Sequence, residues 1–163
     1  MAAARPPARS PVLPPQLLPA NAATVLAFDF GLARIGVAVG DQRQRSAHPL
    51  PGIRTAAYAA RFAAVERLLA EWRPARLVVG MPLAADGSAH AMTRRAERFA
   101  RRLEGRFRLP VARVDERYTS AEAESRVREA AGARRAARAA RDKLLDSYAA
   151  QLILEQYFSE SGR

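Results

Sequence analysis

Cysteine is absent from the 163 residues of the chain, and lysine occurs once, at Lys143. The lack of cysteine excludes disulfide bonds, thiolate metal sites and a cysteine nucleophile, and it is compatible with a reducing compartment. No apolar run approaches the roughly 18 residues of a membrane-spanning helix. Prolines interrupt the apolar stretch at 12–20, which argues against a secretory signal. We therefore expect a cytoplasmic protein that makes no membrane contact.

The charge of the chain is strongly one-sided. Its 27 basic residues, all but one of them arginine, oppose 16 acidic residues and give a formal net charge of +11. A GC-rich genome raises arginine, alanine and proline together, and this accounts for the preference of arginine over lysine. It does not account for the sign of the net charge. The excess therefore favours a polyanionic partner such as nucleic acid, whose phosphates arginine binds well.

The chain divides into a tail and one domain. Residues 1–22 are rich in alanine and proline, which block helix formation, so we expect a disordered tail. This tail suits a weak tether for nucleic acid, an inert extension or a misassigned start codon. Residues 23–160 are expected to form a single domain without internal repeats.

Apolar runs and three- to four-residue periodicity predict strands that alternate with helices. Ser88 is expected to cap the second helix, and Thr119 a third through a capping box with Glu122. The stretch 132–141 is basic and alanine-rich, and we assign it no state. The expected strands are 24–30, 35–41, 46–54, 76–81 and 109–114, and the main helices are 56–72, 88–105 and 142–158. This order predicts an α/β sheet with helices on both faces.

Acidic residues at the ends of three expected elements do not fit exposed helix faces. Asp29 ends an apolar strand, Asp115 and Glu116 follow another, and Asp146 begins an apolar helix. A buried carboxylate is costly unless it faces a cation or solvent, and ligand sites of α/β sheets gather at strand ends. Oxygen ligands without histidine or cysteine suit Mg²⁺ or Mn²⁺. The pattern therefore predicts a two-ion site that acts on phosphodiesters.

Each acidic position also has a simpler structural interpretation. Asp29, followed by Phe-Gly, suits a turn. Asp115 and Glu116 suit a helix entry that the helix dipole favours, and Asp146 suits the first turn of a helix. Packing alone does not require all of them at element ends, so their joint placement favours the metal site.

Five segments carry a family resemblance. They are the hairpin 29–41 (DFGLARIGVAVGD), the strand and loop 78–88 (VVGMPL and then DGS), the segment 114–123 (VDERYTSAEA), the basic stretch before the last helix, and the segment 146–158 (DSYAAQLILEQYF). In this order they resemble the YqgF (RuvX) family of bacterial RuvC-like proteins, which belongs to the ribonuclease H superfamily. The resemblance covers about residues 24–158, and the proline-rich N-terminal extension is not part of it.

The resemblance implies a ribonuclease H-like fold, with a five-stranded mixed sheet flanked by helices. It also implies that Asp29, Glu116 and Asp146 are the metal-binding catalytic acids. In the resulting hypothesis Asp29 bridges two Mg²⁺ or Mn²⁺ ions, Glu116 holds one and orients water, and Asp146 holds the other. The implied function is a nuclease that matures the 5′ end of the 16S ribosomal RNA precursor, with a Holliday junction resolvase as the alternative.

Basic residues near these acids are candidates for binding phosphates, or else they belong to a solvated helix face. The candidates are Arg34, Arg117, Arg134, Arg135, Arg138, Arg141 and Lys143. A second hypothesis is a non-catalytic factor that binds nucleic acid in ribosomal RNA processing or transcription. A small-molecule ATPase is less favoured, because the second domain that such enzymes need is absent. No residue pattern selects RNA over DNA, and we expect a monomer or a weak homodimer.

Overall fold

The structure is a computed structural model. It describes residues 21–116 and 138–162, without the side chains of residues 21 and 138–146. Most of the expected tail, the helix expected from Thr119, and the candidates Arg117, Arg134 and Arg135 therefore lie outside the described residues. No described helix is both long enough and apolar enough to span a membrane.

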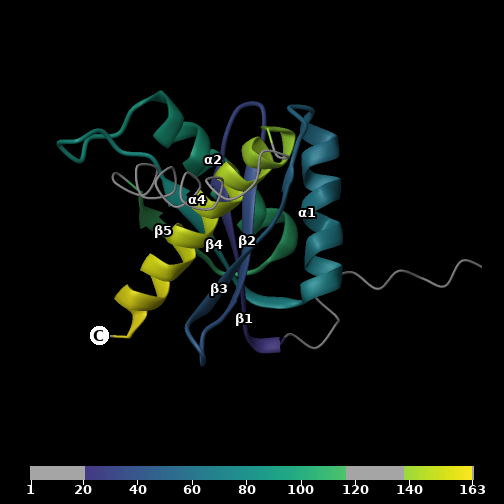
Figure 1. Cartoon of the computed structure of the whole chain (residues 1–163). Coiled ribbons are helices and arrows are strands. Elements are labelled where there is room, and N and C mark those ends of the chain that lie inside the picture. Colours follow the sequence, from purple (N-terminus) through teal and green to yellow (C-terminus); the bar gives the residue numbers. More distant parts are fainter. Residues whose placement is uncertain (1–20, 117–137, 163) are drawn as a thin grey trace, which may run out of the picture.

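A mixed sheet of five strands forms the centre of the molecule (Figure 1). Its spatial order is β3-β2-β1-β4-β5. The pairs β1–β2 and β2–β3 are antiparallel, whereas β1–β4 and β4–β5 are parallel. The elements along the chain are β1 Asn21–Phe30, β2 Ile35–Asp41, β3 Ser46–Ile53, α1 Tyr58–Trp72, β4 Pro74–Met81, α2 Ala91–Phe107, β5 Val111–Asp115 and α4 Arg138–Ser161. The five expected strands are thus confirmed, with bounds shifted by up to three residues.

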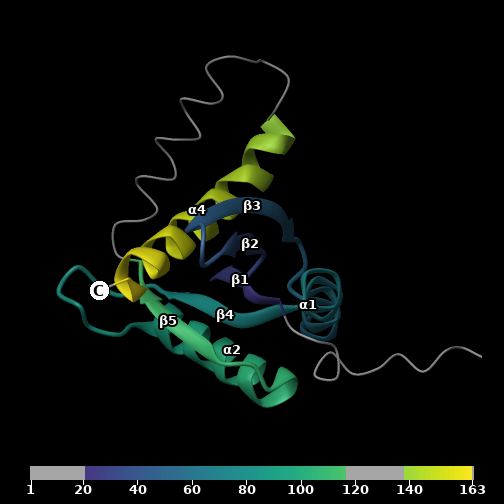
Figure 2. The ribbon, with the colours of Figure 1, turned by 90° about the horizontal axis from the view of Figure 1, so that it is seen from below.

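Helices cover both faces of the sheet, as the sequence predicted. Helices α1 and α2 lie on one face and α4 lies on the other (Figure 2). Strand side chains alternate between the two layers. In β1, Leu26 and Phe28 join the core beneath α1 and α2, whereas Val25 and Ala27 join the core beneath α4. Because β1 is buried on both faces, its sequence reads as one continuous apolar run.

Helix α2 begins later than expected, and Ser88 does not cap it. The Ser88 amide and hydroxyl both donate to Asp86 Oδ1, at 2.9 and 2.6 Å, in the preceding turn. His90 is the cap instead: its Nδ1 accepts from the Met92 amide at 3.2 Å, and its own amide donates to Thr93 Oγ1 at 3.0 Å. The nearby Asp86 carboxylate competes for Ser88, which moves the helix start to Ala91.

Helix α4 begins at Arg138 rather than at residue 142, so part of the unassigned basic stretch is helical. Its alanines and arginines have high helix propensity, which favours this extension. The apolar residues of the sequence predict an inner side of this helix made of Leu145, Ala149, Leu152, Ile153 and either Gln156 or Tyr157. Of these, Ile153 and Tyr157 face the sheet. Ala149 and Leu152 instead form a separate small cluster with Tyr148. The sheet-facing residues that the prediction missed are Ala150, Leu154 and Phe158.

Candidate active site

Asp29 lies near the end of the central strand β1, on the face that α4 covers. Its position follows from strand alternation, because Val25 and Ala27 point to the same layer. Across β2 its register partner is Gly36. On the other side, the parallel ladder with β4 ends at Phe28 and Val79, one residue before Asp29 and Gly80. Glycine on β2 and on β4 therefore leaves room around the half-buried carboxylate.

Glu116 follows β5 directly and is fixed to β4 by its backbone. Its amide donates to the Met81 carbonyl at 3.2 Å, which extends the β4–β5 ladder by one residue. Neighbouring residues of a strand point to opposite faces. Asp115 accordingly lies beside α2, where it lines a hollow with Arg94 and Glu97. Of the two adjacent acids, only Glu116 therefore shares a face with Asp29.

Gly80 gives the Glu116 side chain its place over the sheet. A Cβ atom on Gly80 would lie 2.4 Å from Glu116 Oε2 and 2.5 Å from Ile153 Cδ1. Any larger residue would have to displace the Glu116 carboxylate or the α4 side chain above it. The carboxylate thus occupies the space between β4 and α4.

The carboxyl groups of Glu116 and Asp29 interact directly. Burial, followed by the negative charge of Asp29 and a hydrogen bond with its side chain, raises the pKa of Glu116 to about 9; the charge of Asp115 adds to this. Two carboxylates this close repel each other unless they share a proton or bind a cation. The pair therefore has the chemistry of a site for a divalent cation.

Asp146 lies in α4, and its side chain is outside the described residues. The neighbouring Ser147 is buried and its hydroxyl donates to the Leu50 carbonyl of β3. Position 146 precedes Ala150 by one turn and Ile153 by two, and both of these side chains face the sheet. Position 146 thus belongs to the helix that covers the sheet face of Asp29 and Glu116.

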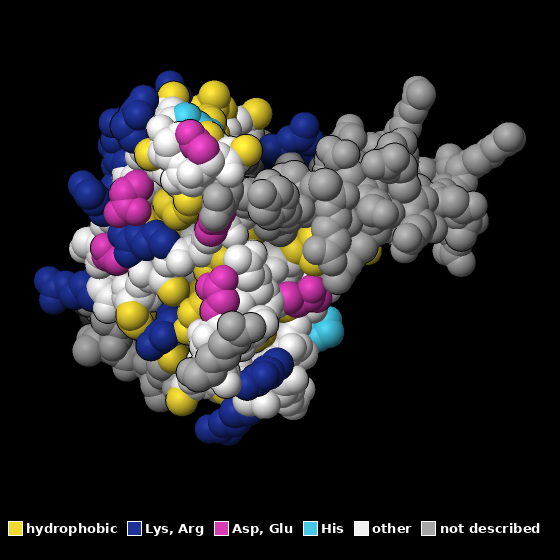
Figure 3. Space-filling view, turned by 90° about the vertical axis from the view of Figure 1, so that its left-hand side faces the viewer, with side chains coloured by type: hydrophobic (Ala, Val, Ile, Leu, Met, Phe, Trp, Pro, Cys, Tyr) yellow, Lys and Arg dark blue, Asp and Glu magenta, His cyan; other side chains and the backbone are white. Residues whose placement is uncertain are grey.

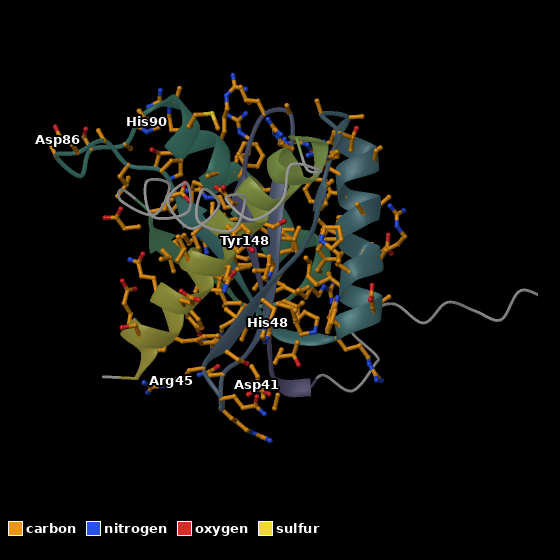
Figure 4. The ribbon with its side chains drawn as sticks, in the orientation of Figure 1. Asp41, Arg45, His48, Asp86, His90 and Tyr148 are labelled. Carbon is orange, nitrogen blue, oxygen red and sulfur yellow. The ribbon has the colours of Figure 1, made fainter. Side chains whose placement is uncertain are left out.

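Among the described side chains, no three acidic or histidine groups come together to hold a metal ion. The two histidines of the sequence have other places: His48 is in β3 and His90 caps α2 (Figure 4), and neither is among the causes of the raised pKa of Glu116. The donors that do meet, Asp29 and Glu116, are both carboxylates. Carboxylate oxygens fit Mg²⁺ or Mn²⁺ better than zinc.

The prediction missed Arg61, which anchors the loop after Asp29. This α1 residue is 7% exposed. Its Nη2 donates to the carbonyls of Gly31 and Leu32 at 2.7 and 2.6 Å, and its Nε donates to the Thr55 carbonyl at 2.6 Å. Its guanidinium also lies 5.3 Å from the centre of the Phe30 ring. The sequence does contain a signal, since Arg61 precedes the buried Val65 by one turn and so falls on the apolar stripe of the helix.

The predicted phosphate-binding residues are only partly described. Arg34 is exposed in the loop between β1 and β2, close in sequence to Asp29. Arg138, Arg141 and Lys143 lie in the first turns of α4, but their side chains are outside the described residues. Their role in binding nucleic acid stays a prediction.

Similar proteins agree on one family. A family model described as RuvX, Holliday junction resolvase, matches residues 23–160. A protein of Dechloromonas aromatica named "Putative pre-16S rRNA nuclease" is 53% identical over 135 residues, which are 83% of this chain and 90% of that protein. A protein of the same name from Nitrosomonas europaea is 48% identical over 147 residues, which are 90% of this chain and 97% of that protein.

Solved structures agree on the fold. Thermus thermophilus RuvC superposes with a TM-score of 0.51 at 18% sequence identity, over 85% of this chain and 96% of that chain. The same protein in complex with a Holliday junction substrate gives a TM-score of 0.50 at 19% identity, over 85% and 95%. Together with the strand order, this likeness confirms the predicted ribonuclease H-like fold.

Proposed function

Because this chain belongs to the RuvX family, we propose that it is a divalent-metal-dependent nuclease that cleaves the precursor of 16S ribosomal RNA near its 5′ end. The observation that carries the proposal is the contact between Asp29 and Glu116 on the face beneath α4. Two carboxylates that meet at the carboxyl ends of parallel strands match the usual position of ligand sites in α/β sheets. A turn role for Asp29 or a helix-entry role for Glu116 would not require the two side chains to meet.

We assign the metal-binding role to Asp29, Glu116 and Asp146. A pair of bound Mg²⁺ or Mn²⁺ ions would supply an activated water and stabilise the leaving oxygen. Asp29 is central in the sheet and suits a carboxylate shared by two ions. Glu116 is held over Gly80 and suits the ligand of one ion, where its second oxygen can orient a water. Asp146 would complete the site from α4.

Cleavage of RNA that carries the 5′ leader of the 16S precursor tests this assignment. The full chain is incubated with the transcript in Mg²⁺ or Mn²⁺, and product formation is compared among the variants Asp29→Asn, Glu116→Gln and Asp146→Asn. Each should lose more than about a hundredfold in rate, because loss even of outer-shell partners of a metal site costs about 10- to 100-fold. Retained cleavage in Asp29→Asn contradicts the proposal.

Asp41→Asn is the matched control. Asp41 pairs with Thr24 across the β1–β2 hairpin, at the end of the sheet away from Asp29. Its Oδ1 accepts from the Arg43 and Gln44 amides, at 2.8 and 3.0 Å. Asparagine retains that acceptor oxygen, so this variant loses a carboxylate charge without losing the turn. It should cleave like the unmodified protein.

Resolution of Holliday junctions is the second candidate, favoured by the description of the matching family model. A resolvase cuts two strands symmetrically and therefore needs a symmetric dimer. Cleavage of a four-way DNA junction, measured beside the RNA and together with the molar mass in solution, separates the two candidates. Binding of either substrate without cleavage would instead support the non-catalytic factor.

A further inference from the structure

Helix α2 presents an outward surface of positive charge. It carries six arginines and two glutamates, and all six arginines are exposed. Its glutamates are neutralised from within: Arg113 of β5 bonds Glu97 at 2.9 and 3.1 Å and also bonds Glu104. The hydrogen bonds of Arg113 hold the pKa of Glu97 below its ordinary value. The arginines of α2 thus face solvent with their acidic neighbours already paired.

A hollow of about 330 Å³ lies between the first turns of α1, the end of β1 and the arginine surface of α2. We call it the α1–α2 hollow. Among the residues that the structure describes, none of those lining it is acidic. Its aromatic floor and arginine rim include Phe30, Tyr58, Phe62, Arg95, Arg98 and Arg102. Its volume lies within the range of about 300–1,000 Å³ that is typical of small-ligand sites.

The apolar side chains of this hollow are unusually open to solvent. In the described part of the chain, the large hydrophobic residues that are exposed are Leu32 (53%) and Tyr58 (51%), and both line the hollow. Two neighbours hold the Tyr58 ring in place. The centre of the Tyr58 ring lies 4.7 Å from the centre of the Phe62 ring and 4.9 Å from the Arg102 guanidinium. An exposed, preordered aromatic ring beside cations is the usual platform for a base of a single-stranded nucleic acid.

The arginine rim is available to a ligand. Within residues 21–116 and the described side chains of α4, Arg95 and Arg98 form no ion pair. In Figure 3 arginine side chains project along the left-hand edge, where α2 lies. A larger hollow on the other side of α2 differs, because its described lining residues include Glu97 and Asp115 but no aromatic side chain. Charge and ring content therefore favour the α1–α2 hollow for an anionic ligand that carries a base.

The hollow opens at the same end of the sheet as the acidic pair. Phe30, which lines it, follows Asp29 directly, and their side chains point to opposite faces. A nucleic-acid strand bound at Asp29 would therefore reach the α1–α2 hollow by passing the end of β1. The loop there is held by Arg61 through the carbonyls of Gly31 and Leu32.

We propose that the α1–α2 hollow binds an unpaired nucleobase of a single-stranded segment of the substrate, and that Arg95, Arg98 and Arg102 bind the adjoining phosphates. This inference rests on the proposed function for the identity of the substrate as nucleic acid. It adds a strand preference, since the bases of an intact duplex are stacked and paired and do not enter such a hollow.

Binding of a short fluorescent single-stranded RNA, measured by anisotropy in EDTA, tests the arginine rim. The variant Arg95→Ala/Arg98→Ala is compared with Arg43→Ala/Arg67→Ala, which removes two exposed arginines elsewhere and changes the net charge equally. The first variant should bind at least about tenfold more weakly. The slope of the logarithm of its binding constant against the logarithm of the salt concentration should fall in magnitude by about 1.4, because each phosphate contact in a single strand contributes about 0.7 to that slope. Equal affinities of the two variants would overturn the proposal.

A single-stranded RNA that contains 2-aminopurine tests the base site. The fluorescence of the base should be quenched on binding to the unmodified protein and to Tyr58→Phe, but not to Tyr58→Ala. Tyr58→Ala should also bind about fivefold or more weakly, as expected for loss of one stacked base. Urea unfolding of Tyr58→Ala confirms its fold. Equal quenching in both Tyr58 variants, or equal affinity for duplex and single strand, would overturn the base site.

These binding results are independent of cleavage. Metal-free conditions and the variant Asp29→Asn both permit binding without turnover, so a protein that cuts no substrate can still show the difference between the two double variants. Failure of the nuclease proposal and failure of the hollow are therefore separate outcomes. An acidic protein segment in the hollow, the competing occupant, would leave RNA affinity unchanged in every variant and would overturn the proposal.

Discussion

Gly80 of β4 lies against the carboxylate of Glu116, so closely that a Cβ atom on Gly80 would stand 2.4 Å from Oε2. Glycine-to-alanine substitution at this position should displace the carboxylate from Asp29. The atoms that the methyl group meets, on Glu116 and Ile153, are ends of flexible side chains, so the fold should persist. We expect Gly80→Ala to lose most metal-dependent cleavage with a loss of about 1–3 kcal/mol in unfolding free energy. Cleavage assays and urea unfolding measure the two effects.

Gly105→Ala is the matched control for that substitution. Gly105 lies in α2, and nothing stands within 4 Å of a Cβ atom there. Alanine is favoured over glycine in a helix by about 1 kcal/mol. This variant should therefore be slightly more stable and fully active. If Gly80→Ala is equally active, the carboxylate does not need the space over position 80.

The metal-free protein should become less stable as the pH rises. The pKa of Glu116 is raised from 4.5 to about 9. Between these values the native state holds a proton that the unfolded chain has released, so the free energy of unfolding falls with increasing pH. Glu116→Gln cannot ionise, and it should lack this component. Urea unfolding in EDTA at about pH 5 and about pH 9 measures the difference between the two proteins.

Bound metal should reverse this trend. A divalent cation must displace the proton shared near Glu116, so Mg²⁺ or Mn²⁺ should bind more tightly at higher pH and stabilise the unmodified protein more than Glu116→Gln. If the metal-free unfolding free energies of the unmodified protein and of Glu116→Gln differ by the same amount at about pH 5 and about pH 9, the carboxyl pair is contradicted.

The acidic pair was predictable from sequence because local patterns determine both of its positions. The apolar runs ending in Asp29 and before Glu116 indicate buried strands, and strand alternation then fixes the face of each side chain. The choice between Asp115 and Glu116 came from the family resemblance. Its physical basis is the register of β5 with β4, in which Met81 pairs with Asp115. Register depends on contacts distant in sequence, which local periodicity does not contain.

Features that depend on competition or on distant partners were not predicted. The start of α2 depends on Asp86 engaging Ser88, which leaves His90 to cap the helix. The role of Arg61 depends on loop carbonyls about thirty residues away in the sequence. In both cases the residue type allows several partners: neighbouring residues compete for Ser88, and the tertiary structure selects the partners of Arg61.

Arg61→Ala should weaken both stability and cleavage. Three backbone carbonyls, those of Thr55, Gly31 and Leu32, lose their charged donor. Hydrogen bonds to charged groups contribute about 1.5–3 kcal/mol each when buried, and the loop is partly exposed, so we expect a loss of about 2–4 kcal/mol. Arg61→Lys should recover only part of this, because an ammonium group does not reproduce the guanidinium fork. Urea unfolding gives the free energies.

Arg67→Ala serves as the control for Arg61, because Arg67 lies on the same helix and is exposed. Its unfolding free energy should change by no more than about 0.5 kcal/mol. Without urea and at a saturating metal concentration, Arg61→Ala should remain folded. It should cleave more slowly, because the loop after Asp29 has lost its anchor. Unchanged cleavage in Arg61→Ala would show that this loop needs no anchor for catalysis.

Ser147→Ala should separate the position of α4 from the chemistry of its carboxylate. The Ser147 hydroxyl donates to the Leu50 carbonyl and is nearly fully buried, one residue after Asp146. Removing the donor leaves a partly buried carbonyl unpaired, at a cost of about 1–2 kcal/mol. Because this bond holds α4 to β3 beside the proposed ligand, kcat should fall while KM for RNA changes little. Ser161→Ala is the control, since Ser161 is exposed and its hydroxyl donates to the Tyr157 carbonyl of its own helix, at 2.8 Å. Equal kcat in the two serine variants would mean that α4 keeps its place without the Ser147 bond.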